Sequence, residues 1–139
     1  MKKLIFITAL ILMTGISFGQ VLPKGARIGI HVMTIELQPG VTLEQFIQSY
    51  SDKLLTEYNK LMSPDIHRYL VKGLRGEFAD SYCMIAVIKS EEAFAKYYNT
   101  DLSQTELLRS IREKIKPIED ELKKLGTYKQ EHFTQWEVQ

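Results

Sequence analysis

The chain has 139 residues, of which 18 are lysine or arginine and 17 are aspartate or glutamate, and its formal net charge is +1. Because these charges are interspersed and no basic patch is visible, we expect no nucleic-acid partner and no binding to an anionic membrane surface. The single cysteine, Cys83, excludes an intramolecular disulfide, so a packed core must stabilise the fold.

The N-terminus has the three-part layout of a secretory signal peptide. Lys2 and Lys3 precede an apolar run over residues 4–13, and the segment that follows has small residues, Ser17 and Gly19, at the two positions that a signal peptidase reads. The apolar run is about half of the ~20 residues that a stable membrane span requires. We therefore predict cleavage between Gly19 and Gln20, with an uncleaved N-terminal anchor as the alternative.

This leader predicts an exported protein, periplasmic or secreted, that is not attached to a membrane after cleavage. The chain then divides into a signal peptide over residues 1–19, an N-terminal arm over residues 20–26 and one domain over residues 27–139. A domain of this length can bury one compact core, and it is too short to be two ordinary domains.

The domain begins with a strand and a well-marked helix. Residues Arg27–Leu37 are rich in β-branched and apolar side chains and are followed by a Pro-Gly pair, which predicts a strand and a turn. Thr42 and Gln45 have the spacing of a capping box at a helix start. Apolar residues then recur at three- and four-residue steps, which predicts a helix that ends at the Ser-Pro pair 63–64.

Two strands follow this helix. Residues Ile66–Lys72 and 81–89 are expected to form the second and third strands. Cys83 lies in the apolar run of the third strand, where we expect a buried, inert thiol. The segment 72–76 carries two cations beside glycines and could hold an anion, but a solvated hairpin is the expected structure.

Two more helices are expected between the third strand and the C-terminus. Ser90 opens a short helix, and Ser103 with Glu106 forms a second capping box before a long apolar stripe. Pro117 falls inside this stripe and is expected to kink the helix, because it lacks a backbone amide. Gly126 is expected to cap the end of the helix.

Residues 127–138 alternate between polar and apolar side chains and predict a fourth strand. The element order is therefore β-α-β-β-α-β, the split βαβ arrangement of ferredoxin-like folds. We expect an α+β domain in which a four-stranded antiparallel sheet carries its helices on one face.

Both faces of the first and third strands are apolar, although the helices can cover only one face. The first strand alternates between two sets, Ile28, Ile30 and Val32 on one face and His31, Met33 and Ile35 on the other. We place Met33 on the uncovered face, where a second copy packs sheet against sheet to form a homodimer. The alternative is that the chain's own loops cover this face.

The chain resembles the dimeric α+β barrel superfamily, which includes stress-responsive barrel proteins and antibiotic-biosynthesis monooxygenases. The resemblance covers residues 27–138 and rests on the element order, on the strand with His31 that leads into PGVTLEQF, and on the segment KSEEAFAKYY. It implies a homodimer whose paired sheets enclose a cavity. Members include cofactor-free oxygenases, haem-handling enzymes and a polyketide cyclase, so the fold alone does not define a function.

The resemblance also implies a site. In cyclase-like members, a histidine on the first strand and the alternate residues after it line the cavity, and these positions match His31, Met33 and Ile35. The same comparison puts Tyr97 where such an enzyme has a tyrosine that orients the substrate. Residues 99–103 lack the histidine that follows this tyrosine in the cyclases. A core histidine and a helix-packing tyrosine are the structural alternatives for His31 and Tyr97.

The last strand offers a further row of candidate side chains. Tyr128, Gln130, His132, Thr134 and Trp136 alternate along it, and they are expected to share one face of the sheet. This row, which ends at the ligand-binding candidate Trp136, could line a pocket or form the seam of a dimer.

We expect no metal site and no cofactor. His31, His67 and His132 fall on three different strands but belong to no compact ligand motif. Haem-handling members of the superfamily use a histidine from a helix, and none of the expected helices contains one. The sequence also has no Gly-x-Ser-x-Gly elbow and no Gly-rich phosphate loop.

Two function classes remain. The first is binding of a small apolar or aromatic molecule in a largely apolar cavity, with cofactor-free chemistry as an extension of it. The second is a non-catalytic structural or protein-interaction domain whose interior is filled by side chains. An open pocket lined by His31 and Tyr97 favours the first class, and a packed interior favours the second.

Overall fold

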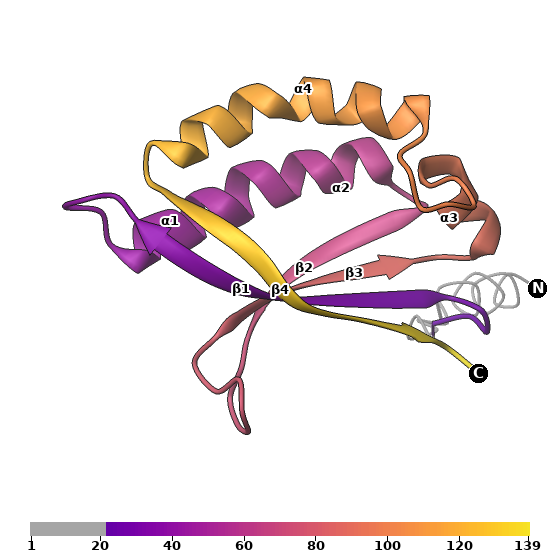
Figure 1. The fold of residues 1–139 in the computed structure, drawn as a ribbon, viewed down its shortest axis with the longest axis horizontal. Helices are drawn as coiled ribbons and strands as arrows, with labels where there is room; N and C mark the ends of the chain where they lie inside the picture. The colour runs from indigo at the N-terminus through magenta and orange to yellow at the C-terminus, as the bar shows by residue number, and fades with distance from the viewer. Residues whose placement is uncertain (1–21) are drawn as a thin grey trace, which may run out of the picture.

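Four antiparallel strands form one sheet, and the helices pack on one side of it (Figure 1). The computed structural model describes residues 22–139, so the predicted signal peptide and the first two residues of the predicted arm lie outside the described residues. The strand order is β2-β3-β1-β4. The elements are β1 (Arg27–Leu37), α1 (Leu43–Ser49), η1 (Tyr50–Leu55), α2 (Thr56–Met62), β2 (Ile66–Lys72), β3 (Tyr82–Ile88), α3 (Glu91–Tyr97), α4 (Glu106–Lys123) and β4 (Gly126–Glu137).

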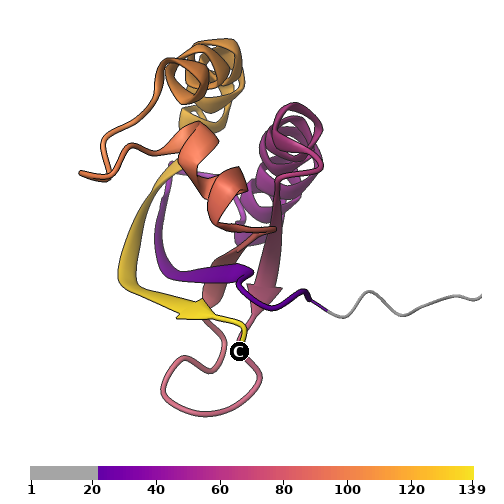
Figure 2. The same ribbon diagram turned by 90° about the vertical axis from the view of Figure 1, so that its right-hand side faces the viewer.

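This architecture confirms the α+β class with an antiparallel four-stranded sheet, and it is compatible with a ferredoxin-like fold. The segments α1, η1 and α2 follow one another without a break, so they act as one long helical rod. Seen from the end, this rod and α4 lie side by side above the sheet (Figure 2). Every predicted strand agrees with the observed strand to within one residue at each end.

The start of the first helix is the predicted capping box. The Thr42 hydroxyl accepts a hydrogen bond from the Gln45 amide at 3.2 Å, and the Gln45 side chain accepts one from the Thr42 amide at 2.8 Å. The rod then passes through the π-helical segment η1, in which Leu54 and Leu55 are both buried. A wider helical turn brings these adjacent side chains toward the core.

The core lies between the sheet and the helices. The largest fully buried side chains come from the helices: Tyr50, Phe46, Leu54, Met62 and Ile115. The sheet contributes buried Met33, Ile66, Met84 and Ile88 to the same cluster. Burying each large apolar side chain stabilises the fold by about 1.5–3 kcal/mol before the loss of chain entropy is counted.

Met33 faces the helices, so its predicted place on the uncovered face is wrong. Its side chain is 5% exposed and belongs to the core, and Ile35 packs against the same core. The other set on β1, which includes Ile28 and Ile30, faces away from the helices. Because both sets are apolar, alternation alone could not show which of them the helices cover.

Segments of the chain itself cover part of the second face. The loop between β2 and β3 hangs on this side of the sheet (Figure 1), and its Phe78 ring lies 5.4 Å from the His132 ring of β4. Leu22 and Pro23 of the arm border a hollow on this face beside Tyr69 of β2. Part of this face remains exposed, and the Tyr69 and Val71 side chains of β2 are 48% and 37% exposed there.

A β-bulge splits the candidate row on β4 between the two faces. The pairing of β1 with β4 shifts between Ile30, which lies opposite Thr134, and Val32, which lies opposite Glu131. His132 sits within this shift and has a left-handed φ of 48°. One extra residue reverses the alternation, so Tyr128 and Trp136 point to opposite faces, contrary to the prediction.

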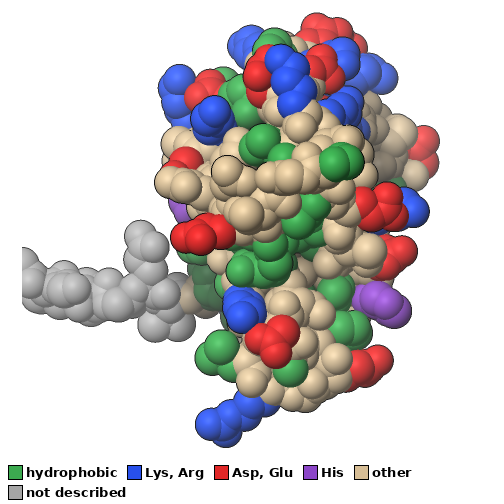
Figure 3. Space-filling model, turned by 90° about the vertical axis from the view of Figure 1, so that its left-hand side faces the viewer, with side chains coloured by type: hydrophobic (Ala, Val, Ile, Leu, Met, Phe, Trp, Pro, Cys, Tyr) green, Lys and Arg blue, Asp and Glu red, His purple; other side chains and the backbone are tan. Residues whose placement is uncertain are grey.

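The N-cap of the long helix α4 lies two residues after the predicted N-cap, Ser103. Thr105 is the N-cap and accepts from the Leu108 amide, whereas Ser103 is held in the preceding loop by the side chains of Asn99 and Asp101. The helix stays continuous on both sides of Pro117. Basic and acidic side chains alternate over the outer surface of the helical layer (Figure 3). Among residues 22–139, no helix is long and apolar enough to cross a membrane.

Contrary to the prediction, Gly126 does not cap α4 but lies where neighbouring atoms leave no room for a side chain. The C-cap is Lys124, and Gly126 is the first residue of β4. A Cβ atom at Gly126 would lie 2.7 Å from the Glu36 carbonyl oxygen and 3.2 Å from a ring carbon of Phe46. A side chain would therefore force β1 and β4 apart where they start to pair.

Candidate functional site

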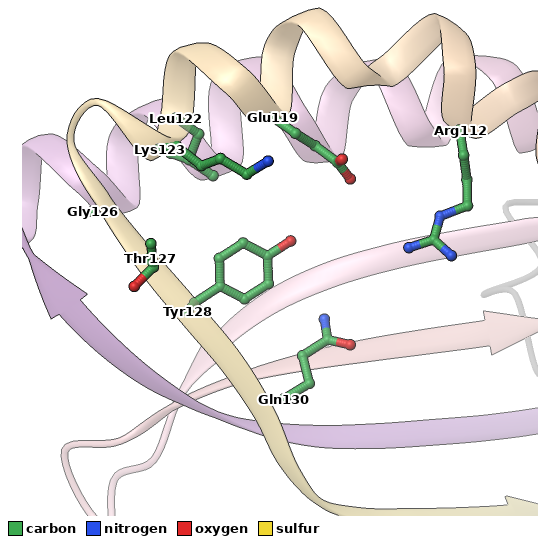
Figure 4. Close-up of a pocket in the computed structure, with 8 residues that line it drawn as sticks. All are labelled: Arg112, Glu119, Leu122, Lys123, Gly126, Thr127, Tyr128 and Gln130. Carbon is green, nitrogen blue, oxygen red and sulfur yellow. The ribbon is translucent and has the colours of Figure 1, made fainter.

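A groove runs between the sheet and α4, and it consists of three connected hollows. The mouth, of about 450 Å³, lies below the C-terminal half of α4 and is bordered by Lys123, Thr127 and Tyr128 (Figure 4). A polar chamber of about 210 Å³ follows, and it shares Tyr128 and Gln130 with the mouth. An apolar chamber of about 250 Å³ ends the groove.

The apolar chamber is built by hydrophobic side chains from the sheet and from the segment around α3. Its walls include Ala86 and Ile88 of β3, Phe94 and Tyr98 of the α3 segment, and Phe133 of β4. Gly29 also borders it, and its missing side chain leaves room beside the Phe133 ring. This end of the groove suits an apolar or aromatic group.

Arg68 is the positively charged group that the sheet contributes to the polar chamber, which Arg112 of α4 also lines. Asn59 of α2 fixes its backbone, because the Asn59 side chain accepts from the Arg68 amide at 2.7 Å and donates to its carbonyl at 2.9 Å. The guanidinium carbon lies 3.9 Å from the centroid of the Tyr58 ring, in cation–π geometry. The Nε atom of Arg68 is buried and has no hydrogen-bond partner among the described residues.

Three tyrosines surround this arginine, and they stay protonated at neutral pH. Burial raises the pKa of Tyr50 and Tyr58, and burial raises the pKa of Tyr128 to about 12. The rings of Tyr50 and Tyr128 meet edge to face at 5.1 Å. The Tyr58 hydroxyl donates to Glu119 of α4 at 3.3 Å. The polar chamber therefore offers neutral phenol groups beside a guanidinium.

His31 stands where the polar and apolar chambers meet, because it borders both. Its ring stacks on Phe133 with the centroids 4.5 Å apart. Burial lowers the pKa of His31, and the positive charge of Arg68 lowers it further. At neutral pH the imidazole is therefore mostly uncharged, so it can accept a proton.

The structure brings only some of the predicted site residues together. His31 lines the groove below α4 and not the inter-sheet face on which it was predicted together with Met33, whereas Met33 and Ile35 pack into the core beside it. Tyr97 is 3% exposed, and its hydroxyl donates to the Met62 carbonyl and to Asp65 at 3.4 Å. Its neighbour Tyr98 lines the groove instead, because it follows the last turn of α3.

Trp136 lies outside the groove. It pairs with Ile28 on the face that points away from the helices, and its side chain is 61% exposed. Its indole nitrogen donates to the Thr134 hydroxyl at 3.2 Å. The β-bulge at His132 is the physical reason for this placement, and no glycine or proline near His132 in the sequence indicates a bulge.

Arg68 was the group that sequence reasoning missed. It stands between Ile66 and Leu70 in the alternation of β2, so a charged residue occupies a position on the apolar, helix-facing side. A charged residue at an inward-facing position of a strand could have marked Arg68 as a candidate site residue, because a charge removed from water needs a partner or a function. Arg112 and Glu119 face the same space across the groove from α4 (Figure 4).

Other chemical candidates stand outside this groove. Cys83 is half-buried on β3, and burial raises the pKa of its thiol. Lys72, in the predicted hairpin, pairs with Asp80 at 3.0 Å. Within the described part of the chain, no group of three or more His, Cys, Asp or Glu side chains could hold a metal ion.

No protein-family model matches this chain, and no curated protein matches it.

Proposed function

We propose that the chain binds one small molecule with an apolar or aromatic body in the groove between the sheet and α4. The observation that supports this proposal is the series of hollows between α4 and the sheet, where side chains of the chain itself could have filled the space. The polar chamber of about 210 Å³ and the apolar chamber of about 250 Å³ adjoin at His31, and together they have a volume in the range of roughly 300–1,000 Å³ that is usual for small-molecule sites.

The arrangement of the groove gives this ligand an orientation. Its apolar body would lie beside Phe94 and Phe133, and its polar end would lie near Arg68 and Tyr128. Cofactor-free proton transfer is an extension of this proposal, because the neutral imidazole of His31 stands between the two chambers. The competing class, a protein-interaction domain, needs the outer apolar face of the sheet and not the groove.

Fluorescence titration with Nile red, a neutral hydrophobic dye, tests the binding function. We expect saturable binding with one dye per chain, weakened several-fold by Phe133→Ala. The matched control is Tyr69→Ala, since Phe133 is 56% exposed and Tyr69 is 48% exposed on the other face. Binding that Tyr69→Ala weakens and Phe133→Ala leaves intact would reject the groove as the binding site.

We also propose that a second copy covers the open face of the sheet, as in the dimeric α+β barrels that the sequence resembles. The support is the apolar set that faces away from the helices, which includes Ile30, Ile85 and Val87, together with exposed Tyr69. The β2–β3 loop and the arm leave this area open, and soluble monomers rarely expose a large apolar patch. A two-fold axis through the face would bury it in both copies.

Light scattering of two variants tests the dimer. Tyr69→Glu puts a charge on the open face, and Leu107→Glu puts one on α4 at a residue with a similar exposed fraction of 46%. We expect twice the monomer mass for the wild type and for Leu107→Glu. Tyr69→Glu should have the monomer mass, because burying an unpaired charge in the interface costs several kcal/mol. A monodisperse wild-type monomer would refute this assembly.

The sequence supports one further proposal, that the protein is exported with its leader removed after Gly19. The mature chain would then begin at Gln20. Intact mass of the protein recovered from the exporting cell tests this directly, and a full-length chain in the membrane fraction would contradict it.

A further inference from the structure

The polar chamber contains a positive charge that the chain does not neutralise. Within residues 22–139, no carboxylate forms an ion pair with Arg68. The Nε atom of the same side chain is buried without a hydrogen-bond partner. Arg68 as a whole is half-buried, but a buried donor atom without a partner costs free energy unless something else binds it, so this arrangement points to a ligand.

The position of Tyr58 leaves the donors of Arg68 available. The guanidinium carbon lies 3.9 Å from the centroid of the Tyr58 ring. A cation–π contact of this kind uses the charge of the guanidinium and does not require its N–H donors. The Asn59 side chain bonds the Arg68 backbone at the free edge of β2, and these two bonds fix the position of the Arg68 Cα atom.

The charges around the groove favour a small anion. Arg112 and Lys123 add two positive charges along the polar chamber and the mouth, and Glu119 supplies one negative charge. Glu119 already accepts from the Tyr58 hydroxyl at 3.3 Å. The balance of charge is positive, so the groove attracts a negatively charged group.

Resting on the proposed function, we propose that Arg68 is the anion-recognition residue of the groove and that the natural ligand is an aromatic or apolar monocarboxylate. Its carboxylate accepts the in-plane N–H bonds of Arg68, because guanidinium and carboxylate match as two-pronged partners. Its apolar body extends past His31 toward Phe133. The raised pKa of Tyr128 keeps a phenol donor available beside the anion.

Binding of a matched pair of probes tests this inference on the purified full chain. The probes are 2-naphthoate and 2-naphthamide, which share one ring system and differ in the charge of the head group. We expect the wild type to prefer the naphthoate about 10- to 100-fold, the usual effect of a hydrogen-bonded charge. Arg68→Gln should abolish this preference, because it should weaken the binding of 2-naphthoate much more than the binding of 2-naphthamide. Arg75→Gln, in the exposed β2–β3 loop, is the control and should keep the preference.

The failure of this inference can be told apart from that of the proposed function. If the wild type binds both probes equally well, the anion site is wrong and the groove remains a binding site. If it binds neither, the proposed function fails as well. A preference that survives in Arg68→Gln, or tighter binding of phenyl phosphate than of 2-naphthoate, would also overturn the assignment. Should Arg68→Gln not fold, Arg68→Lys must still lower the preference about tenfold, because lysine lacks the planar fork.

Discussion

The rings of His31 and Phe133 stack with their centroids 4.5 Å apart and their planes 27° apart. They come from β1 and β4, and they meet because the bulge at His132 turns Phe133 toward the helices. Without the extra residue, Phe133 would lie on the outer face of the sheet, and the apolar chamber would lose one wall. The same irregularity therefore positions His31 and shapes the groove.

The left-handed backbone at His132 predicts a difference between two substitutions. A β-branched residue adopts a φ of 48° poorly, whereas glycine adopts it without cost. We expect His132→Val to lower the free energy of unfolding by about 1–2 kcal/mol relative to His132→Gly. Urea unfolding of both variants measures this, with Thr134→Val as the control at an ordinary strand position. Equal stability of the Val and Gly variants would mean that the bulge is absent in solution.

The Asn59 side chain predicts a second effect on stability. It bonds both the amide and the carbonyl of Arg68 on the edge strand β2, and alanine would leave these partly buried groups without a partner. We expect Asn59→Ala to lower the free energy of unfolding by about 1–3 kcal/mol. Asn99→Ala, which removes a bond to Ser103 in an exposed loop, should cost less than about 0.5 kcal/mol. Comparable losses for the two variants would contradict the special role of Asn59.

The two buried glycines of the sheet should respond differently to an added methyl group. A Cβ at Gly126 would meet the Glu36 carbonyl oxygen at 2.7 Å, whereas one at Gly29 would meet only the Phe133 ring at 3.4 Å. We expect Gly126→Ala to destabilise the fold by about 1–3 kcal/mol, as overpacking does, and Gly29→Ala to have a much smaller effect. Thermal unfolding of the pair measures the difference, and its reversal would show that β1 and β4 approach each other differently.

The lowered pKa of His31 predicts how stability depends on pH. Burial and then the charge of Arg68 hold this pKa below its ordinary value of 6.5, so the unfolded chain takes up a proton on His31 before the folded chain does. The His31 contribution to the free energy of unfolding is complete above pH 6.5, and it is lost as the pH falls toward the folded-state pKa. We expect His31→Gln to reduce the slope of stability against pH below 6.5, measured by urea unfolding at several pH values. An unchanged slope would mean that the pKa of His31 is the same in the folded and unfolded chains, so its side chain would be solvated in the fold.

Much of the fold followed from the sequence, because its signals are local. The strands, the Thr42 capping box and the helical stripes depend on residues within one element, and each lay close to its expected place. The cap of α4 was missed because two hydroxyl residues, Ser103 and Thr105, compete there and the contacts of the loop favour the second. The role of Gly126 was missed because the residues that crowd it, Glu36 and Phe46, are distant in the sequence.

The site was harder to predict than the fold. His31 was identified, but the faces of the sheet were reversed, since both faces of β1 are apolar and only the packing of the helices decides between them. Trp136 was placed with Tyr128 because strict alternation cannot reveal a bulge. Arg68 was visible in the sequence as an exception to the pattern of β2, because a charged residue stands at a position that faces the helices. Such an exception is expected at a functional site.

The most direct test of the binding function uses neighbouring residues of one strand as reporters. Met84 and Ala86 on β3 border the groove, whereas Ile85 and Val87 lie between and beside them on the opposite face. In a methyl NMR titration with the neutral probe 2-naphthamide, we expect large shifts at Met84 and Ala86 and small shifts at Ile85 and Val87. Shifts confined to Ile85 and Val87 would show that the ligand binds the outer face, and the groove would not be the site.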